Sequence, residues 1–228
     1  MNFYVPAVLA ALAAGSAVAQ DSGRITVTGQ GEVAATPDMA TISMGVASQA
    51  ATAEEAMDAT SSSVAALLET LSAAGIEARD VQTSGLNLNP VWDHGSSRPG
   101  APEVTGFNAV NTVTVRKRGL DGLGEVLDDV LGVGANMFQG LSFGLQDPEP
   151  HLDEARRQAV ADARRKAELY AMAAGVELGP IISISEATAM QSPQPMFARQ
   201  TMQAESVPIA EGETTVTAEV TIVWEIKE

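Results

Sequence analysis

Imidazole and thiol groups are the side chains that most often carry catalysis or bind metals, and this chain offers few of them. It contains two histidines, His94 and His151, and no cysteine. Thiol nucleophiles, thiolate zinc sites, iron–sulfur clusters and disulfides are therefore excluded. No G-x-S-x-G sequence marks a nucleophile elbow. The sequence predicts no catalytic residue, no cofactor and no metal site, and we expect a protein that is not an enzyme.

His151 lies among acidic residues, Asp147, Glu149 and Asp153, whose oxygens are possible metal ligands. Acidic side chains and proline are also typical of the first turn of a helix, where negative charge complements the helix dipole. A helical pattern begins at this point of the chain. We therefore interpret the cluster as a helix start rather than as a metal site.

A glycine pair, Gly29 and Gly31, opens a G-x-G-x-x-A sequence that matches a relaxed dinucleotide-binding fingerprint. In that fold the glycines lead into a helix whose N-terminus receives the pyrophosphate. Here Thr36-Pro37 and a second alternating run follow instead. We expect no dinucleotide site, and we interpret the glycines as allowing a bend or bulge in a strand.

Three methionines, Met190, Met196 and Met202, recur at intervals of six in a segment rich in Pro and Gln. Thioethers suit Cu(I), so one hypothesis is a small-ligand or Cu(I)-binding module built on this segment, with His94 as a further ligand. The interpretation that we favour is that these methionines and Phe197 are adaptable apolar contacts for another subunit.

Basic residues are concentrated in the helix expected over residues 149–174, which carries Arg156, Arg157, Arg164, Arg165 and Lys166. Alanines at positions 155, 159, 163 and 167 form a row of small side chains, which lets a helix lie close to its neighbour. The basic groups then face outward. One hypothesis is a docking stripe for an acidic partner, such as a second copy of this chain. The favoured alternative is a solvated face with i, i+4 pairs such as Asp162 with Lys166.

Charge and hydropathy narrow the classes of function. The chain has 228 residues, with 13 Lys and Arg against 29 Asp and Glu, so its formal net charge is −16. Such a charge repels phosphate backbones, and we expect no nucleic-acid partner. The 45% hydrophobic content is enough for a core, and the length suits one domain or two small ones. We expect no integral membrane span in the mature chain, because no apolar run of about 20 residues occurs in it.

The first 20 residues contain no charged side chain and lead to Ala17-Val18-Ala19. This pattern predicts a secretory signal peptide over residues 1–19, although the usual basic residue near the N-terminus is missing. Cleavage after Ala19 leaves 228 − 19 = 209 residues.

Hydrophobic periodicity divides the rest of the chain into strands and helices. The turn at Thr36-Pro37-Asp38 predicts a β-hairpin between strands at 24–33 and 39–47. We expect an α+β fold, an antiparallel sheet with helices packed on one face, built from two loosely repeated split β-α-β units. Its domain covers residues 24–228 in two sub-halves, about 24–118 and 119–228. Further strands are expected at 81–91, 105–118, 137–145, 180–186 and 216–226, and helices at 51–75, 120–131 and 149–174.

Several segments together resemble one family. They are residues 25–33 with Thr36-Pro37-Asp38, residues 75–84, and residues 155–175 running into Leu178-Gly179 and residues 184–186. In this order they are similar to the SIMPL-domain family of secreted bacterial proteins, over the chain from Arg24 to its C-terminus. The recurrent positions of that family look structural and supply no catalytic residue; here they are Gly29, Gly31, Pro37, Asp38, Asp80, Thr83, Gly106 and Gly175.

The resemblance implies a periplasmic or cell-envelope location, an α+β fold and, in some members, large ring-like or channel-like oligomers. It also implies an association with resistance to oxidative stress, without an established reaction. We therefore expect a periplasmic, self-associating protein that contributes to envelope protection. The contacts expected are those on the Met-rich segment and on the basic helix, and the alternative is the ligand or Cu(I) module.

Overall fold

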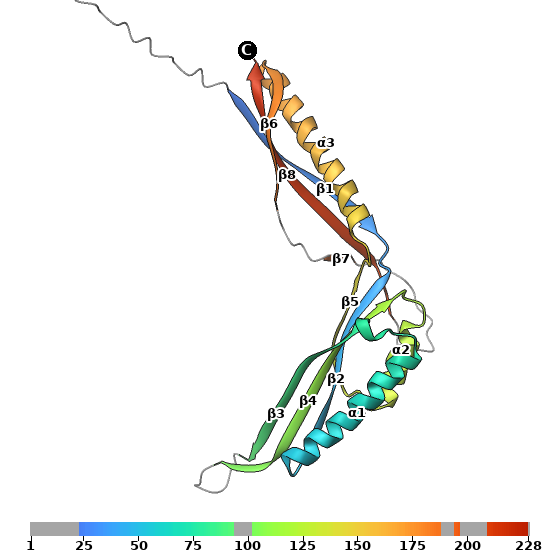
Figure 1. Ribbon diagram of the computed structural model, residues 1–228. Coiled ribbons are helices and arrows are strands. Elements are labelled where there is room, and N and C mark those ends of the chain that lie inside the picture. The colour runs from blue at the N-terminus through green and yellow to red at the C-terminus, as the bar shows by residue number, and fades with distance from the viewer. Residues whose placement is uncertain (1–22, 94–101, 188–193, 197–208, 228) are drawn as a thin grey trace, which may run out of the picture.

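The computed structural model describes residues 23–93, 102–187, 194–196 and 209–227, so the signal peptide expected over residues 1–19 lies outside the described residues. Figure 1 shows two elongated lobes joined end to end at a bend. Each lobe is an antiparallel sheet with helices on one face. The predicted α+β class is therefore confirmed, with the strands divided between two sheets.

The lower lobe contains a four-stranded sheet in the order β3-β4-β2-β5. Helix α1 begins after Thr52, whose hydroxyl accepts from the Glu55 amide while the Glu55 carboxylate accepts from the Thr52 amide. Leu67 and Leu71 of α1 are fully buried against the sheet, whereas Leu68 is exposed. The elements are β2 (Met39–Ala50), α1 (Ala53–Ala73), the short 3₁₀ helix η1 (Ala78–Asp80), β3 (Val81–Asp93), β4 (Glu103–Arg118), α2 (Leu123–Gly132) and β5 (Met137–Gly144).

The upper lobe contains strands in the order β1-β8-β6, with the short β7 also paired to β8. Helix α3 covers β1 and β8, and it ends where Gly175 adopts a left-handed φ of 71°. The strand predicted over residues 216–226 is confirmed as part of β8, in which the alternate residues Val220, Ile222 and Trp224 are buried. The elements are β1 (Arg24–Ala35), α3 (Glu149–Ala174), β6 (Glu177–Glu186), β7 (Gln194–Met196) and β8 (Glu213–Lys227).

The hairpin predicted between the first two strands is wrong. Strand β1 pairs with β8 in the upper sheet, whereas β2 pairs with β4 and β5 in the lower one. The chain passes from one lobe to the other at Thr36-Pro37-Asp38 instead of folding back, as Figure 1 shows. Each sheet thus contains strands from both predicted sub-halves, residues 24–118 and residues 119–228.

The bulge expected at Gly29 and Gly31 is wrong, because β1 pairs with β8 in an unbroken register, while the alternative of a bend stays a prediction. Neither glycine has a positive φ. A Cβ atom on Gly29 would lie 2.5 Å from the Ala163 nitrogen, and one on Gly31 would lie 2.6 Å from the Ala159 nitrogen. The two glycines therefore let the backbone of α3 rest directly on β1, as the row of alanines predicts from the other side of the contact.

Asp38 ties the junction between the lobes together. Its carboxylate accepts hydrogen bonds from the backbone amide of Gln146 at 2.7 Å and from the Gln146 side chain at 3.2 Å. Its backbone accepts from the Gly119 amide and donates to the Gly144 carbonyl. Asp38 lies between β1 and β2, and Gln146 lies between β5 and α3, so these bonds join the two points where the chain crosses.

Candidate functional site

The outer edge of β1 is closed by side chains of α3. The Gln30 amide donates to Asp162 at 3.1 Å, the Glu32 amide donates to Gln158 at 3.3 Å, and the Thr28 carbonyl accepts from Lys166 at 3.0 Å. These contacts occupy backbone groups that an edge strand otherwise offers to another chain. Pairing of a second molecule along this stretch of β1 is therefore blocked.

Asp162 makes one of the contacts that close the edge of β1, and it pairs with Lys166, which makes another. Hydrogen bonds from Lys166, Arg165 and the Gln30 amide hold the pKa of its carboxyl well below the usual range. A lowered carboxyl pKa stabilises the fold above the unfolded-state pKa, and this contribution is lost as the pH falls through the folded-state pKa.

We expect Asp162→Ala to lower the free energy of unfolding by about 1–2 kcal/mol at pH 7, because it leaves the Gln30 amide without its charged acceptor. Urea unfolding measures the loss, which should shrink as the pH falls below about 4. Asp153→Ala on the same helix is the matched control, since Asp153 is more exposed and pairs with Arg156 at the surface. An equal loss in both variants would contradict the role given to Asp162.

The basic residues of α3 all have acidic partners within the chain. Arg156 contacts Glu186, Asp153 and Glu149, and the predicted pair of Asp162 with Lys166 is confirmed at 2.7 Å. The three other arginines pair along the helix, as Arg157 with Glu154, Arg164 with Glu168 and Arg165 with Asp162. These contacts agree with a solvated, internally balanced face, while docking of an acidic partner stays a prediction.

Most of the other residues singled out in the sequence lie in parts of the chain that the structure does not describe. His94, Met190, Phe197 and Met202 lie outside the described residues, and for Met196 the structure describes only the backbone, in β7. The Cu(I) hypothesis therefore stays a prediction. His151 lies in the first turn of α3 with a buried Nδ1 atom that has no hydrogen-bond partner. Across the described ranges, no three His, Asp or Glu side chains are arranged to hold a metal ion.

Asp80 is the one buried carboxylate in the part of the chain that the structure describes, with a side chain 4% exposed. It accepts from Arg118 Nε at 2.8 Å and from Arg118 Nη2 at 3.0 Å. These bonds lower the pKa of Asp80, and the positive charge of Arg118 adds to the effect against the opposing effect of burial. Each carboxylate oxygen accepts one of these bonds, so the pair joins η1 to β4.

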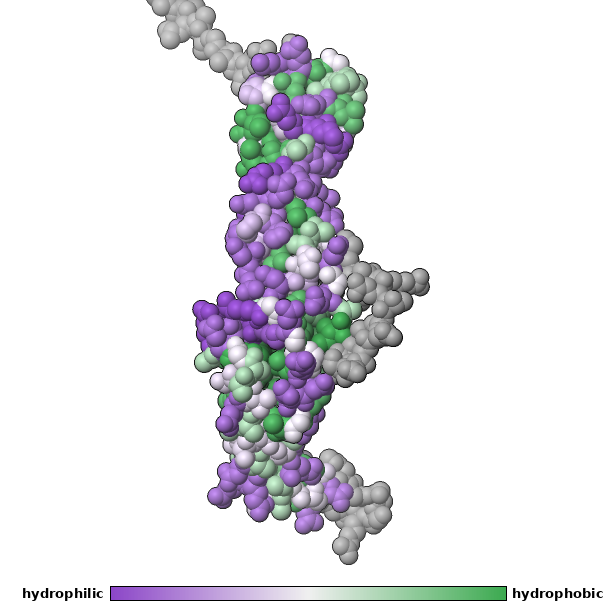
Figure 2. All heavy atoms as spheres, turned by 90° about the vertical axis from the view of Figure 1, so that its right-hand side faces the viewer, coloured by the Kyte–Doolittle hydropathy of each residue, from purple (hydrophilic) through white to green (hydrophobic). Residues whose placement is uncertain are grey.

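An apolar surface that the sequence analysis missed lies on β6; we call Ile181, Ile182 and Ile184 the β6 surface. Ile181 is paired with Trp224 and Ile184 with Ile222, so these two isoleucines face the same side of the sheet as α3. Helix α3 packs over β1 and β8, and the three β6 side chains remain 48–55% exposed. Figure 2 shows hydrophobic groups gathered near the free end of an otherwise hydrophilic upper lobe.

A second uncovered surface lies on β3; we call Leu86, Leu88 and Trp92 the β3 surface. Strand β3 is an edge strand whose side chains are 40–56% exposed at these three positions. Among the described elements, α1 and α3 lie over other strands of the two sheets, and the side chains of both surfaces remain exposed. The signal in the sequence was the run Ile181-Ile182-Ser183-Ile184, which is apolar toward both faces of a strand.

The fold and these surfaces define a class: an α+β protein of two end-to-end lobes whose edge strands present apolar side chains. No helix within the described part of the chain is both long and apolar enough to cross a membrane. Residues 25–224 match the family model SIMPL, described as "Protein of unknown function (DUF541)", and the chain belongs to this family.

Two relatives illustrate the family. The chain is 40% identical over 212 residues to the "26 kDa periplasmic immunogenic protein" of Brucella melitensis, which covers 90% of this chain and 85% of the relative. It is 31% identical over 222 residues to the "Uncharacterized protein YggE" of Escherichia coli, and this match covers 94% of this chain and 87% of the relative. The resemblance noted in the sequence is thereby confirmed.

Proposed function

We propose that this chain is a periplasmic, non-enzymatic protein that self-associates and contributes to protection of the cell envelope against oxidative stress. The observation that carries the proposal is the pair of uncovered apolar surfaces on β6 and β3. Contiguous exposed apolar side chains on a soluble chain mark contacts with another protein. The pattern of residues 1–19 and the printed name of the Brucella relatives support the periplasmic location.

A second copy of the chain is the partner that fits best. The β6 surface lies in the upper lobe and the β3 surface in the lower lobe, so each copy can contact two neighbours and build a larger assembly. The charges beside β6 are already paired, Arg164 with Glu168 and Arg156 with Glu186. The net charge of −16 therefore opposes association less at this face than elsewhere.

The native mass of the chain from Gln20 to Glu228 tests the proposal. Light scattering after size exclusion is expected to give a defined oligomer at micromolar concentration. An apolar contact between acidic chains should persist or strengthen when salt rises, because salt screens the repulsion. Dissociation at moderate salt would instead assign the contact to the arginines of α3. A monomer of 228 − 19 = 209 residues at every concentration would contradict self-association.

Substitution of both surfaces identifies the contacts. We expect Ile184→Asp combined with Leu86→Asp to reduce the native mass to that of the monomer, because each change places a charge where an apolar contact is needed. Leu169→Asp is the control, since Leu169 is equally exposed, at 54%, but lies on α3. A double variant that keeps the full mass would exclude these surfaces as the contacts.

The link to stress protection needs a cellular measurement. A strain that lacks the protein is expected to survive peroxide less well than its parent, and the chain with its N-terminal segment should restore survival. The monomeric double variant should restore it less, if association carries the protection. Equal rescue by both proteins would separate protection from assembly.

A further inference from the structure

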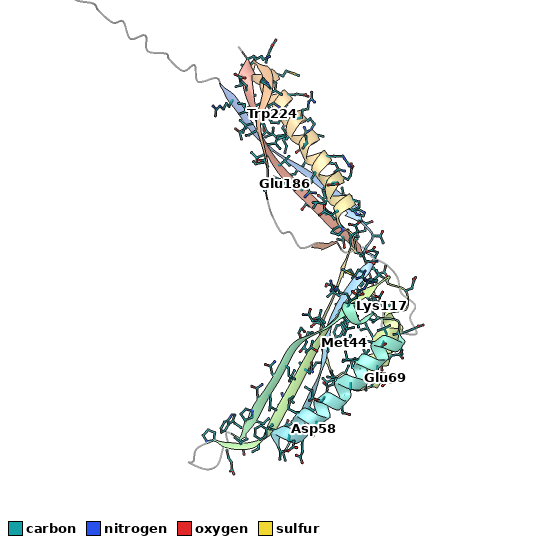
Figure 3. All side chains as sticks on the ribbon, viewed as in Figure 1. Met44, Asp58, Glu69, Lys117, Glu186 and Trp224 are labelled. Atoms are coloured by element: carbon teal, nitrogen blue, oxygen red, sulfur yellow. The ribbon has the colours of Figure 1, made fainter. Side chains whose placement is uncertain are left out.

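The lower lobe holds a small apolar pocket lined in part by Met44. Figure 3 shows Met44 far from Trp224 of the upper lobe. Its volume is about 150 Å³, and every side chain that lines it is apolar. Met44 of β2 and Val130 of α2 are buried in its wall, at 1% and 2% exposure. Leu131 of α2 and Phe138 of β5 are 53% and 54% exposed and lie at its mouth. Solvent therefore reaches a cavity that offers it no polar group.

A β-bulge in β5 builds one wall of this pocket. Ser43 pairs with Gly140, but Met44 pairs with Phe138, so Gln139 is the extra residue. The Gln139 side chain accepts from the Ser43 hydroxyl at 3.1 Å and contacts the Thr112 hydroxyl at 3.4 Å. These bonds hold Gln139 on the open face of the sheet, away from the helices.

The consequence of the bulge is the position of Phe138. In a regular register Gln139 would stand opposite Met44, on the side of the sheet that α1 and α2 cover. The bulge replaces it with Phe138, whose ring joins Met44 on that side. A polar residue is thereby excluded from the pocket, and an aromatic residue is placed at its mouth.

We propose that this pocket binds one small, uncharged, apolar group of about the size of an aromatic ring. An apolar pocket of about 150 Å³ has room for a molecule of the size of benzene. A charged or hydrogen-bonding group would lose its hydration there without gaining a partner. The Met44 thioether and the Phe138 ring provide sulfur–aromatic and ring–ring contacts. Any polar substituent of the ligand must project through the mouth into water.

This inference does not rest on self-association, because no residue of the pocket belongs to the β3 or β6 surface.

A titration with toluene, followed by NMR, tests the inference. The isotope-labelled methyl groups of Met44 and Met137 are the reporters, since both residues line the pocket. We expect a saturable shift of these two signals with a Kd on the order of 1 mM or below. The other methionine signals should move little.

Benzylammonium provides the test of ligand class. It has the same ring but carries a positive charge, which a chain of net charge −16 attracts at long range. A preference for toluene therefore cannot arise from the overall charge and must come from the apolar pocket. Tighter binding of benzylammonium than of toluene would overturn the proposal.

Two variants locate the binding. Leu131→Asp should weaken toluene binding by about tenfold, because it puts a charge at the mouth. Leu169→Asp, at an equally exposed helix position, should not. Ala135→Leu fills the pocket from inside, and Ala173→Leu adds the same atoms at an exposed position of α3.

The expected result is that Leu131→Asp and Ala135→Leu lose affinity while their two controls bind as the parent does. The proposal is overturned by three results: no saturable shift, equal shifts of all methionine signals, or equal losses in variants and controls. An affinity that falls as the protein is concentrated would also overturn it, because another copy would then be the occupant.

Discussion

Gly31→Ala is expected to lower the free energy of unfolding by about 3 kcal/mol, a large effect for one added methyl group. The new Cβ atom would lie 2.6 Å from the backbone nitrogen of Ala159, and the Ala155 carbonyl is closer still. Backbone atoms in the middle of a helix cannot move singly, so α3 must lift away from β1 along several residues. The bonds from Gln30 to Asp162 and from Glu32 to Gln158 should then lengthen or break.

Urea unfolding followed by circular dichroism measures the loss. Gly140→Ala in β5 is the matched control, because a Cβ atom there meets no neighbour within 4 Å and Gly140 has no positive φ. Its effect should stay within about 0.5 kcal/mol. If both variants lost the same free energy, the close approach of α3 to β1 would not be what Gly31 provides.

Arg118→Ala is expected to lower the thermal midpoint at pH 7 by several degrees, more than the loss of an arginine that pairs only with exposed carboxylates. The change leaves the buried carboxylate of Asp80 without the two hydrogen bonds that it accepts from Arg118. Arg116, whose nearest contact with Asp80 is 3.9 Å, cannot replace them. Arg157→Ala is the control, because Arg157 pairs with Glu154 at the surface and lies on α3 of the other lobe.

The pH dependence gives an independent test of the same pair. The hydrogen bonds from Arg118 lower the pKa of the Asp80 carboxyl. The stabilisation of the fold by this pair is therefore fully present above the ordinary carboxyl pKa. It is lost as the pH falls through the lowered, folded-state value. The difference in midpoint between the parent and Arg118→Ala should therefore shrink below about pH 4. A difference that stayed constant in acid would show that Arg118 acts through packing rather than through Asp80.

The bounds of the regular elements were largely predictable from local patterns. The helix expected over residues 149–174 coincides with α3, because proline and acidic residues start it and Gly175 ends it. The last strand was predictable since its alternating apolar residues are more buried than the residues between them.

Strand pairing was not predictable in the same way. The sequence predicted a hairpin at Thr36-Pro37-Asp38, but the partner of β1 is β8, near the other end of the chain. Alternation of apolar and polar residues predicts a half-buried strand, but it does not predict which other strand pairs with it. The role of Gly29 and Gly31 was unpredictable for the same reason. Glycine is required there because the backbone of α3, about 130 residues later in the chain, lies against β1.

The candidate surfaces also differ in how far local patterns predicted them. The basic residues of α3 were visible in the sequence, and their acidic partners within the helix were predictable from the i, i+3 and i, i+4 spacing. The β3 and β6 surfaces were not, because an apolar side chain on a strand is buried in most folds. Ile184 is exposed for a tertiary reason: α3 rests mainly on β1 and β8 and leaves the Ile184 side chain uncovered.

The acidic charge, the lack of thiol chemistry, the α+β class and the family resemblance follow from the amino-acid sequence, because composition, periodicity and local motifs are carried by neighbouring residues. The folded structure was needed to show that the strands form two lobes, that side chains of α3 close the edge of β1 and that apolar side chains of β3 and β6 are exposed. It also decided that a bulge turns Phe138 toward an apolar pocket. The physical reason is that each of these features depends on which distant segments share a contact, and local patterns do not specify that choice.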